Sequence, residues 1–219
     1  MPELSFDVLG ARAERYSLVP TLTLRIHVGE ATGVAVHAIA LRCQIRVEPH
    51  RRRYSEPEVA ALFDLFGESA RWADTLKPLQ FATISTMVPG FTGSTEIDLP
   101  VPCSYDLEVA STKYFRALDD GEIPLLVLYS GTLFYLLDGR FAVEQIPWSL
   151  QTSVAVPVST WRAVVEEHFP HAGWIRLDLD TLRELGAYKS RAAAPTWDAT
   201  VLSLLRAAAK PEPESRSLP

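Results

Sequence analysis

The sequence predicts an α+β protein with an antiparallel β-sandwich-like N-terminal part and a small helical C-terminal part. Residues 39–47 alternate between apolar and polar side chains, which is typical of an antiparallel strand with one face in water. The run Ile123–Tyr135 is almost entirely apolar and predicts a core strand that is buried on both faces, Leu126 included. From residue 159 onward, apolar residues recur at helical spacing instead.

Composition and charge indicate an ordinary globular protein. The chain has 219 residues, of which 47% are hydrophobic and 22% charged, and its net charge is −6 at pH 7. This length fits one large domain or two small ones. The negative charge argues against nonspecific nucleic-acid binding by the molecule as a whole. Residues 1–10 lack the regions of a signal peptide, and the longest apolar run is too short to span a membrane, so we expect a cytoplasmic protein.

Short strands are expected throughout residues 1–150. Patterns typical of strands occur at residues 4–8, 22–28, 39–47, 80–88, 95–99, 103–110, 123–135 and 141–146. Turn-forming residues separate most of them, and Pro100 and Pro102 exclude a regular central strand between two of them. Strands at this spacing favour an antiparallel sandwich.

One crossover helix interrupts this series of strands. The segment Ser55-Glu56-Pro57-Glu58 is a capping box, in which the Ser55 hydroxyl can accept a hydrogen bond from the Glu58 amide. Apolar residues then follow at helical spacing: Val59, Leu62, Phe63 and Phe66. Gly67 is a plausible end of this helix. Such a crossover helix is untypical of a plain immunoglobulin-like sandwich.

The C-terminal part is expected to be helical. Residues 151–210 should form a helical part that packs on the domain formed by residues 1–150, with helices near residues 159–169, 180–188 and 197–209. Residues 211–219 have the composition of a disordered tail.

The sequence contains no recognisable catalytic or metal-binding motif. The sequence has no glycine-rich phosphate loop, no GxSxG elbow and no HExxH motif. Cys43 and Cys103 are predicted to be buried, reduced thiols without a disulfide. His168 and His171 are the one close histidine pair, but the intervening Pro170 ends the helix, so we expect neither a metal nor a cofactor.

A small enzyme with a dispersed site is the alternative interpretation. Cys103, His168 and Asp119 are the candidate participants. A lone thiol needs a nearby base to act as a nucleophile, and the sequence places none beside Cys103. Asp119 and Asp120 could supply paired carboxylates for acid–base chemistry, although aspartates in an Asp-Asp-Gly turn more often cap the backbone.

Two features favour binding of another protein. Arg51, Arg52 and Arg53 form the one basic run, which could contact an acidic partner or a phosphate, or could simply be solvated. Trp148 and Trp161 belong to a group of tryptophans near the C-terminal part, and such rings anchor either interfaces or helices on a sheet. We therefore predict a non-catalytic, protein-binding accessory protein that uses these five residues, and the sequence leaves a homo-oligomer open.

The segments PLLVLYSGTLFY, VPVSTWRAVVEEHFP, GWIRL and PTWDATVLSLL resemble an uncharacterised bacterial family. The resemblance covers nearly the whole chain, but its motifs are hydrophobic and structural, so no catalytic residue is carried over. Genes of this family often lie beside genes for nickel–iron hydrogenases and their maturation proteins. The resemblance thus implies a scaffold or chaperone in hydrogenase assembly, with a hydrogenase subunit or maturation factor as the partner.

Overall fold

The computed structural model describes residues 2–103, 109–137, 139–170 and 175–209. The chain divides into two compact units, Met1–Ile175 and Arg176–Pro219. The sequence predicts a division after residue 150. The residues that follow it instead form strand β8 (Gln151–Pro157) and helix α5 (Val158–His168), which belong to the first unit. The α+β class and the antiparallel sheets are confirmed.

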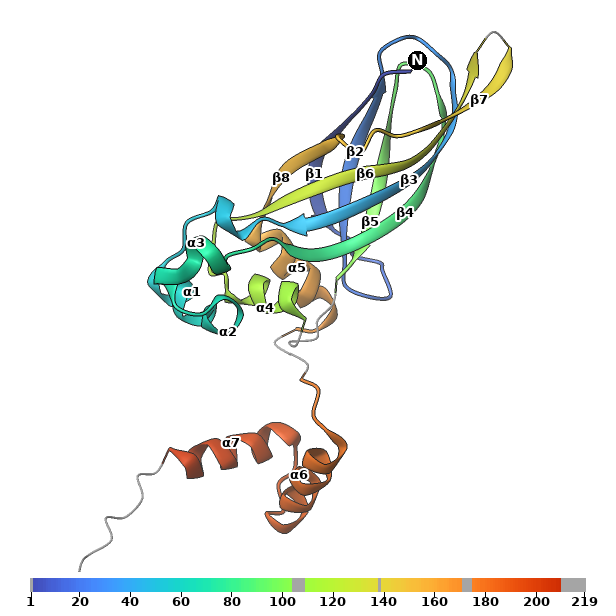
Figure 1. The fold of residues 1–219 in the computed structure, drawn as a ribbon. Coiled ribbons are helices and arrows are strands. Elements are labelled where there is room, and N and C mark those ends of the chain that lie inside the picture. Colours follow the sequence, from blue (N-terminus) through green and yellow to red (C-terminus); the bar gives the residue numbers. More distant parts are fainter. Residues whose placement is uncertain (1, 104–108, 138, 171–174, 210–219) are drawn as a thin grey trace, which may run out of the picture. The chain divides into compact units, whose positions relative to one another are not determined.

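Two antiparallel sheets form the body of the first unit (Figure 1). The three-stranded sheet has the order β1–β2–β5, with β1 at Leu4–Ala13, β2 at Thr21–Glu30 and β5 at Ser94–Pro102. The five-stranded sheet has the order β4–β3–β6–β7 with β8 also paired to β6, and its further strands are β3 (Val36–Val47), β4 (Leu79–Phe91), β6 (Glu122–Leu137) and β7 (Arg140–Gln145). Buried apolar side chains of both sheets form one continuous core.

Strand β6 is the apolar run that the sequence predicted to be the core strand. It pairs with β3 along one edge, and along the other edge with β8 and then β7. Its inward side chains are buried, and they include Ile123, Leu125, Val127, Tyr129 and Leu133. Leu126 and Leu128 point the other way and are only half-buried. The prediction that this strand is buried on both faces is therefore wrong for its outer face.

Gly131 lies where β6 changes its edge partner. Its φ angle is +135°, and a Cβ atom there would overlap the carbonyl oxygen of Ala40 in β3. Only glycine fits this position, because any side chain would collide with the neighbouring backbone. The Gly131 carbonyl accepts a hydrogen bond from the Ile146 amide (3.0 Å), which starts the link between β7 and β8.

Short helices cover one end of the sandwich (Figure 1). Between β3 and β4 lie η1 (Pro49–Arg51), α1 (Glu56–Ala61), α2 (Phe63–Phe66), η2 (Ser69–Arg71) and α3 (Trp72–Thr75), and α4 (Ala110–Ala117) precedes β6. The crossover helix predicted after Ser55 is confirmed. Both hydrogen bonds of its capping box form, from the Glu58 amide to Ser55 Oγ and from the Ser55 amide to Glu58 Oε2.

The second unit contains helices α6 (Leu179–Arg191) and α7 (Trp197–Ala208). The Tyr188 hydroxyl lies 3.0 Å from Ser203 Oγ, and Lys189 Nζ lies 5.7 Å from the centre of the Trp197 ring. In the described part of this unit, Thr200 is buried but no hydrophobic side chain is. The tail predicted at residues 211–219 lies outside the described residues.

Candidate interaction surfaces

Both cysteines are free and buried. Burial raises the pKa of the Cys103 thiol to about 12, even though a hydrogen bond from the Leu22 backbone opposes the shift. The pKa of Cys43 is also raised to about 12 by burial. A thiolate is the nucleophilic form of cysteine, so neither position suits nucleophilic chemistry near neutral pH.

The other candidates of the enzyme interpretation have structural contacts. His168 Nε2 lies 2.9 Å from the Ser17 carbonyl oxygen and Nδ1 lies 3.1 Å from that of Val164, so the ring ties α5 to the β1–β2 loop. The Asp119 backbone N–H donates to Glu58 Oε1 at 3.0 Å, while its own side chain is exposed. Among the described residues, no hydrogen bond joins the side chains of Cys103, His168 and Asp119 to one another.

The described residues contain neither a cluster of metal-ligating side chains nor a helix that could span a membrane. Within the described ranges, no group of three or more His, Cys, Asp or Glu side chains could hold a metal ion. His171 lies outside the described residues. None of the described helices has both the length and the apolar character needed to cross a membrane.

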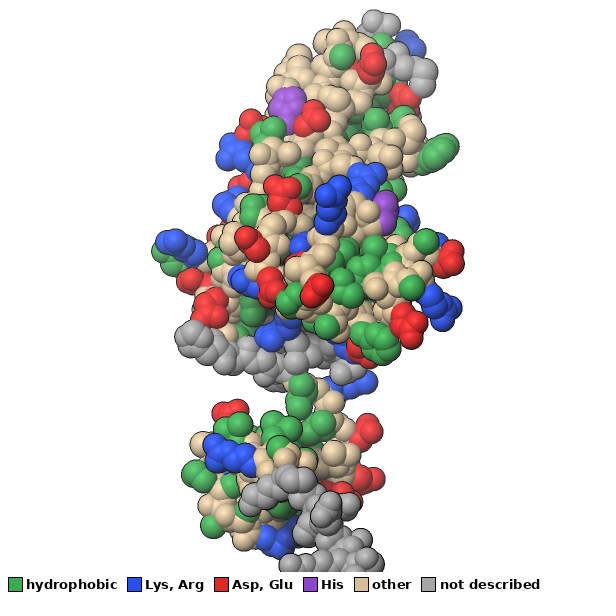
Figure 2. All heavy atoms as spheres, turned by 90° about the vertical axis from the view of Figure 1, so that its left-hand side faces the viewer, with side chains coloured by type: hydrophobic (Ala, Val, Ile, Leu, Met, Phe, Trp, Pro, Cys, Tyr) green, Lys and Arg blue, Asp and Glu red, His purple; other side chains and the backbone are tan. Residues whose placement is uncertain are grey.

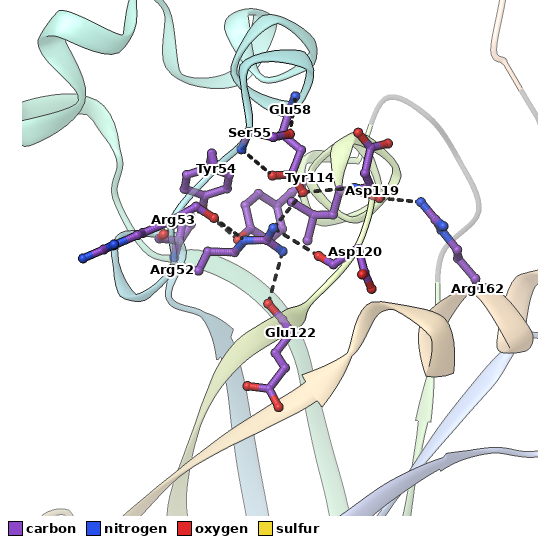
Figure 3. Close-up of polar contacts among 12 residues, drawn as sticks. Arg52, Arg53, Tyr54, Ser55, Glu58, Tyr114, Asp119, Asp120, Glu122 and Arg162 are labelled. Atoms are coloured by element: carbon purple, nitrogen blue, oxygen red, sulfur yellow. Dashed lines mark hydrogen bonds and ion pairs between the residues drawn. The ribbon is translucent and has the colours of Figure 1, made fainter.

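Arg52, the middle of the basic run, belongs to a structural polar cluster (Figure 3). Its Nη2 atom lies 2.7 Å from Glu58 Oε1, and the two side chains are 12% and 4% exposed. The guanidinium also donates to the carbonyl oxygens of Asp120 and Glu122, both at 3.2 Å, and lies 5.0 Å from the centre of the Tyr54 ring. The Arg52 guanidinium is therefore engaged in internal contacts.

The same cluster joins three segments of the chain. The Tyr54 hydroxyl donates to the Pro49 carbonyl oxygen at 2.6 Å and lies 2.8 Å from the Tyr114 hydroxyl. Burial raises the pKa of Tyr54 to about 12. Desolvation also acts to raise the pKa of Glu58, but hydrogen bonds from backbone amides and the charge of Arg52 outweigh it, so this pKa is lowered. The polar groups of this cluster supply one another's hydrogen-bond partners, which indicates a structural role.

The two outer arginines of the basic run are more accessible. Arg51 Nη1 donates to Ser153 Oγ of β8 at 2.6 Å, and its Nε atom lies 3.7 Å from the carboxylate of Glu48, which is buried. The Arg53 side chain is exposed and has no polar partner among the described residues. The structure thus divides the run into one internal and two accessible arginines.

Arg51 lies at the border of a larger basic surface that no local sequence pattern indicates. On the outer side of the five-stranded sheet, Arg42 lies opposite Ser130, and Arg46 lies opposite Leu126 in β6. Leu126 in turn lies opposite Ser153, the residue that Arg51 contacts. We call the outer side of this sheet, with Arg42, Arg46 and Arg51, the arginine face.

The arginine face has few acidic neighbours. The five strands of its sheet contain only two acidic residues, Glu122 and Glu144, although the chain has 27. Arg42 has no ion pair or hydrogen bond through its side chain within the described residues, and Arg46 donates only to Gln44, at 3.4 Å. Arg42 and Arg46 are four residues apart on β3, so their backbones lie ~13 Å apart. The Debye length is about 8 Å at physiological ionic strength, so the two charges are largely screened from each other, and each attracts an acidic group only near its own position on the face.

The exposed arginines of the three-stranded sheet provide a contrast. Arg12 is paired with Asp98 at 3.2 Å, and Arg25 Nε lies 2.7 Å from Glu96. These positive charges are neutralised by neighbours in the same sheet. The exposed arginines of the three-stranded sheet thus have acidic partners in their own sheet, whereas Arg42 and Arg46 of the arginine face have none among the described residues.

The two candidate tryptophans lie in opposite environments. Trp148 is 89% exposed in the link between β7 and β8, beside a hollow of about 230 Å³ lined by residues that include Leu4, Leu133 and Pro147. This volume is below that of most small-molecule pockets, which is about 300 Å³ or more. Trp161 is 4% exposed and packs on Phe115, with 5.5 Å between the ring centres. Trp148 is therefore accessible to a partner, whereas Trp161 belongs to the core.

The second unit exposes many large apolar side chains on its two helices. Figure 2 shows hydrophobic side chains gathered on the visible side of the smaller body. The exposed large apolar residues of its helices are Leu179, Leu182, Trp197, Val201, Leu202, Leu204 and Leu205. We call these seven residues the apolar helix face.

The fold and its surfaces define a mixed α+β protein built on two antiparallel sheets with a helical C-terminal unit. The chain belongs to DUF6084, a family of unknown function whose model matches residues 1–213. The expectation of an uncharacterised family is thereby confirmed. No curated protein matches the chain. Among solved structures, it is similar to the solution structure of a putative late embryogenesis abundant protein, with 15% identity, 72% coverage of both chains and a TM-score of 0.34. A likeness at this level carries no functional argument.

Proposed function

We propose that the protein is a non-catalytic accessory protein that binds an acidic surface of another protein through its arginine face. One observation carries this proposal. Arg42, Arg46 and Arg51 share the outer side of a sheet with only two acidic residues in its strands, in a chain of net charge −6. Arg51 is partly compensated by Glu48, but Arg42 and Arg46 have no ion pair within the described residues. An acidic protein that keeps such a basic surface can attract acidic partners while it repels copies of itself elsewhere.

The chemistry of this surface suits carboxylate-rich protein surfaces. Arginine presents a planar fork of donors that binds carboxylates in bidentate geometry and loses its hydration more readily than lysine. Leu126 and Leu128 lie half-buried between the arginines and offer apolar contact. Trp148 adds an exposed aromatic ring at the edge of the same sheet, and such rings commonly supply binding energy. The arginines would mainly speed encounter, and the apolar groups would set affinity.

The partner in this proposal is a subunit or maturation factor of a nickel–iron hydrogenase. Its support is the resemblance of segments such as PLLVLYSGTLFY to a family encoded beside hydrogenase genes. Maturation proteins that handle metals usually carry cysteine or histidine clusters, so a scaffold or chaperone role suits this sequence better. The two free cysteines are in keeping with a cytoplasmic location, where thiols stay reduced.

Partner capture with charge-reversal variants tests the proposal. The double variant Arg42→Glu, Arg46→Glu is compared with Arg15→Glu, Arg71→Glu, which makes the same charge change at exposed positions outside the sheet. Tagged proteins are purified from host cells, and the captured proteins are identified and quantified. We expect the wild type and the control to retain an acidic partner, and the face variant to lose at least about tenfold in recovery, as for a loss of ~1.4 kcal/mol.

Thermal unfolding first establishes that both double variants are folded. Raising the salt concentration during capture should also weaken recovery by the wild type, because salt screens exposed charges. Equal recovery with the face variant and the control would show that the arginine face does not bind the partner.

A further inference from the structure

We infer that the second unit is a homodimerisation element, in which α6 and α7 pack against the same helices of a second copy as an antiparallel four-helix bundle. This inference is independent of the proposed function, because it concerns a different surface and a different partner. It explains why the unit, within its described residues, forms helices without a hydrophobic core.

Within the described residues of the second unit, the apolar helix face has no partner of the kind that stabilises amphipathic helices. All seven of its side chains are exposed, and Leu205 is 60% exposed. Helices this short are marginal in isolation and gain most of their stability by burying an apolar stripe. A pair of such helices with one shared apolar side is half of a four-helix bundle.

The apolar stripe of α7 is distinct from the side that contacts α6. Thr200 is buried, and Ser203 Oγ lies 3.0 Å from the Tyr188 hydroxyl, so these two residues mark the side of α7 that faces α6. Val201, Leu204 and Leu205 follow the helical spacing of a separate stripe. The contact between α6 and α7 therefore does not use this stripe, which can pack against another surface.

Charge complementarity favours a second copy as that surface. Each helix carries acid in its first turn and base in its last turn: Asp180 and Arg191 in α6, and Asp198 and Arg206 in α7. A twofold axis that pairs a helix antiparallel with its own copy brings each acidic end to a basic end. The same charge order suits the dipole of each helix, but the dipole does not account for the exposed leucines.

The net charge of this region also favours self-association. Residues 176–209 contain five basic and four acidic residues, which gives a net charge of +1 against −6 for the whole chain. Two copies can therefore meet at this unit without the repulsion that the rest of the chain would cause. A strongly acidic or basic partner would find no complementary field there.

The oligomeric state of the full-length chain tests the inference. Sedimentation equilibrium over a wide range of concentration should give a dimer for the wild type and for Arg176→Gln, which changes an exposed residue outside both helices. Leu205→Asp changes the charge by the same amount, but it places a carboxylate in the proposed interface. We expect it to raise the dimer dissociation constant at least tenfold and to leave the thermal unfolding of the first unit unchanged.

Exchanging the charges at residues 198 and 206 provides a second test, which still applies if Leu205→Asp unfolds the helices. Asp198→Arg and Arg206→Asp should each weaken the dimer, and the double exchange should restore it, because the two residues meet between copies. A wild-type chain that is monomeric at every concentration overturns the inference. A dimer whose dissociation constant is unchanged in Leu205→Asp and in both charge variants also overturns it.

Discussion

Arg52 and Glu58 form an ion pair of 2.7 Å that is almost closed to solvent, with side chains 12% and 4% exposed. The pair fastens the segment after β3 to the first turn of α1. Arg52 also holds the turn before β6 through the carbonyl oxygens of Asp120 and Glu122. Arg51, which extends over the sheet to Ser153, is the preceding residue. The buried pair therefore fixes the border of the arginine face.

Removing one partner of this pair should strongly destabilise the protein. Arg52→Met leaves the Glu58 carboxylate buried without its cation, and such a change costs about 3–5 kcal/mol. The matched control is Arg53→Met, which makes the same substitution at an exposed neighbour and should stay within about 0.5 kcal/mol of the wild type. Urea unfolding measures both. Similar unfolding midpoints for the two variants would show that the pair does not stabilise the fold.

Stability in acid should depend on Glu30. Glu30 is only 4% exposed. Its carboxylate accepts hydrogen bonds from the backbone amides of Thr32, Val34 and Glu3 at 2.9–3.1 Å. Burial acts to raise the pKa of Glu30, but these hydrogen bonds outweigh burial, so the pKa lies below its ordinary value of 4.5. The unfolded chain then binds the proton more readily. The contribution of Glu30 is therefore present above the unfolded pKa and is lost as pH falls through the folded pKa.

We expect Glu30→Gln to lower stability near neutral pH by about 1–3 kcal/mol, because it removes buried hydrogen bonds to a charged acceptor. The variant should also lose less of its stability between neutral pH and about pH 3 than the wild type loses. Thermal unfolding at several pH values checks this, with the exposed Glu3→Gln as the control. A pH profile of Glu30→Gln parallel to that of the wild type contradicts the assignment.

Gly131 should not tolerate alanine. A Cβ atom there would overlap the Ala40 carbonyl oxygen, and the φ angle of +135° is strained for any residue with a side chain. We expect Gly131→Ala to lower the free energy of unfolding by about 3 kcal/mol or more, because it combines backbone strain with a steric clash. Gly10→Ala is the control, since a Cβ atom at that position meets nothing within 4 Å. Equal thermal midpoints for the two variants would disprove the close approach of β6 to β3.

The two thiols should be free but unreactive in the native protein. Burial raises the pKa of both Cys43 and Cys103 to about 12, so little thiolate forms near neutral pH. Titration with a thiol reagent should be slow in native conditions and should give two thiols per chain after unfolding without reductant. Finding fewer than two thiols would indicate a disulfide or another modification.

Local patterns in the sequence predicted much of the fold. The alternation around Cys43 predicted β3, and the Ser55 to Glu58 capping box predicted α1, because both signals arise from neighbouring residues. The half-exposed outer face of β6 was not predicted. Its even-numbered residues, such as Leu126 and Leu128, are apolar despite facing outward, so the sequence shows no alternation there.

The surfaces were harder to predict, because they depend on strand register and on tertiary contacts. Arg42 and Arg46 belong to β3, and only the pairing of β3, β6 and β8 brings them onto one face with Arg51. The basic run also contains no local signal that its middle residue, Arg52, is internal. The polar phase of β3 was visible in the sequence, but its relation to the basic run was not.

The central claim is that the protein acts by binding and not by chemistry, and a complementation assay in host cells tests it most directly. Cys103→Ala, His168→Ala and Asp119→Ala are compared with the double variant Arg42→Glu, Arg46→Glu, after each is shown to be folded. Hydrogenase activity and partner capture are measured for every variant. We predict that the three alanine variants keep both and that the arginine-face variant loses both. A folded Cys103→Ala or His168→Ala variant that abolishes activity while partner capture survives would contradict the claim.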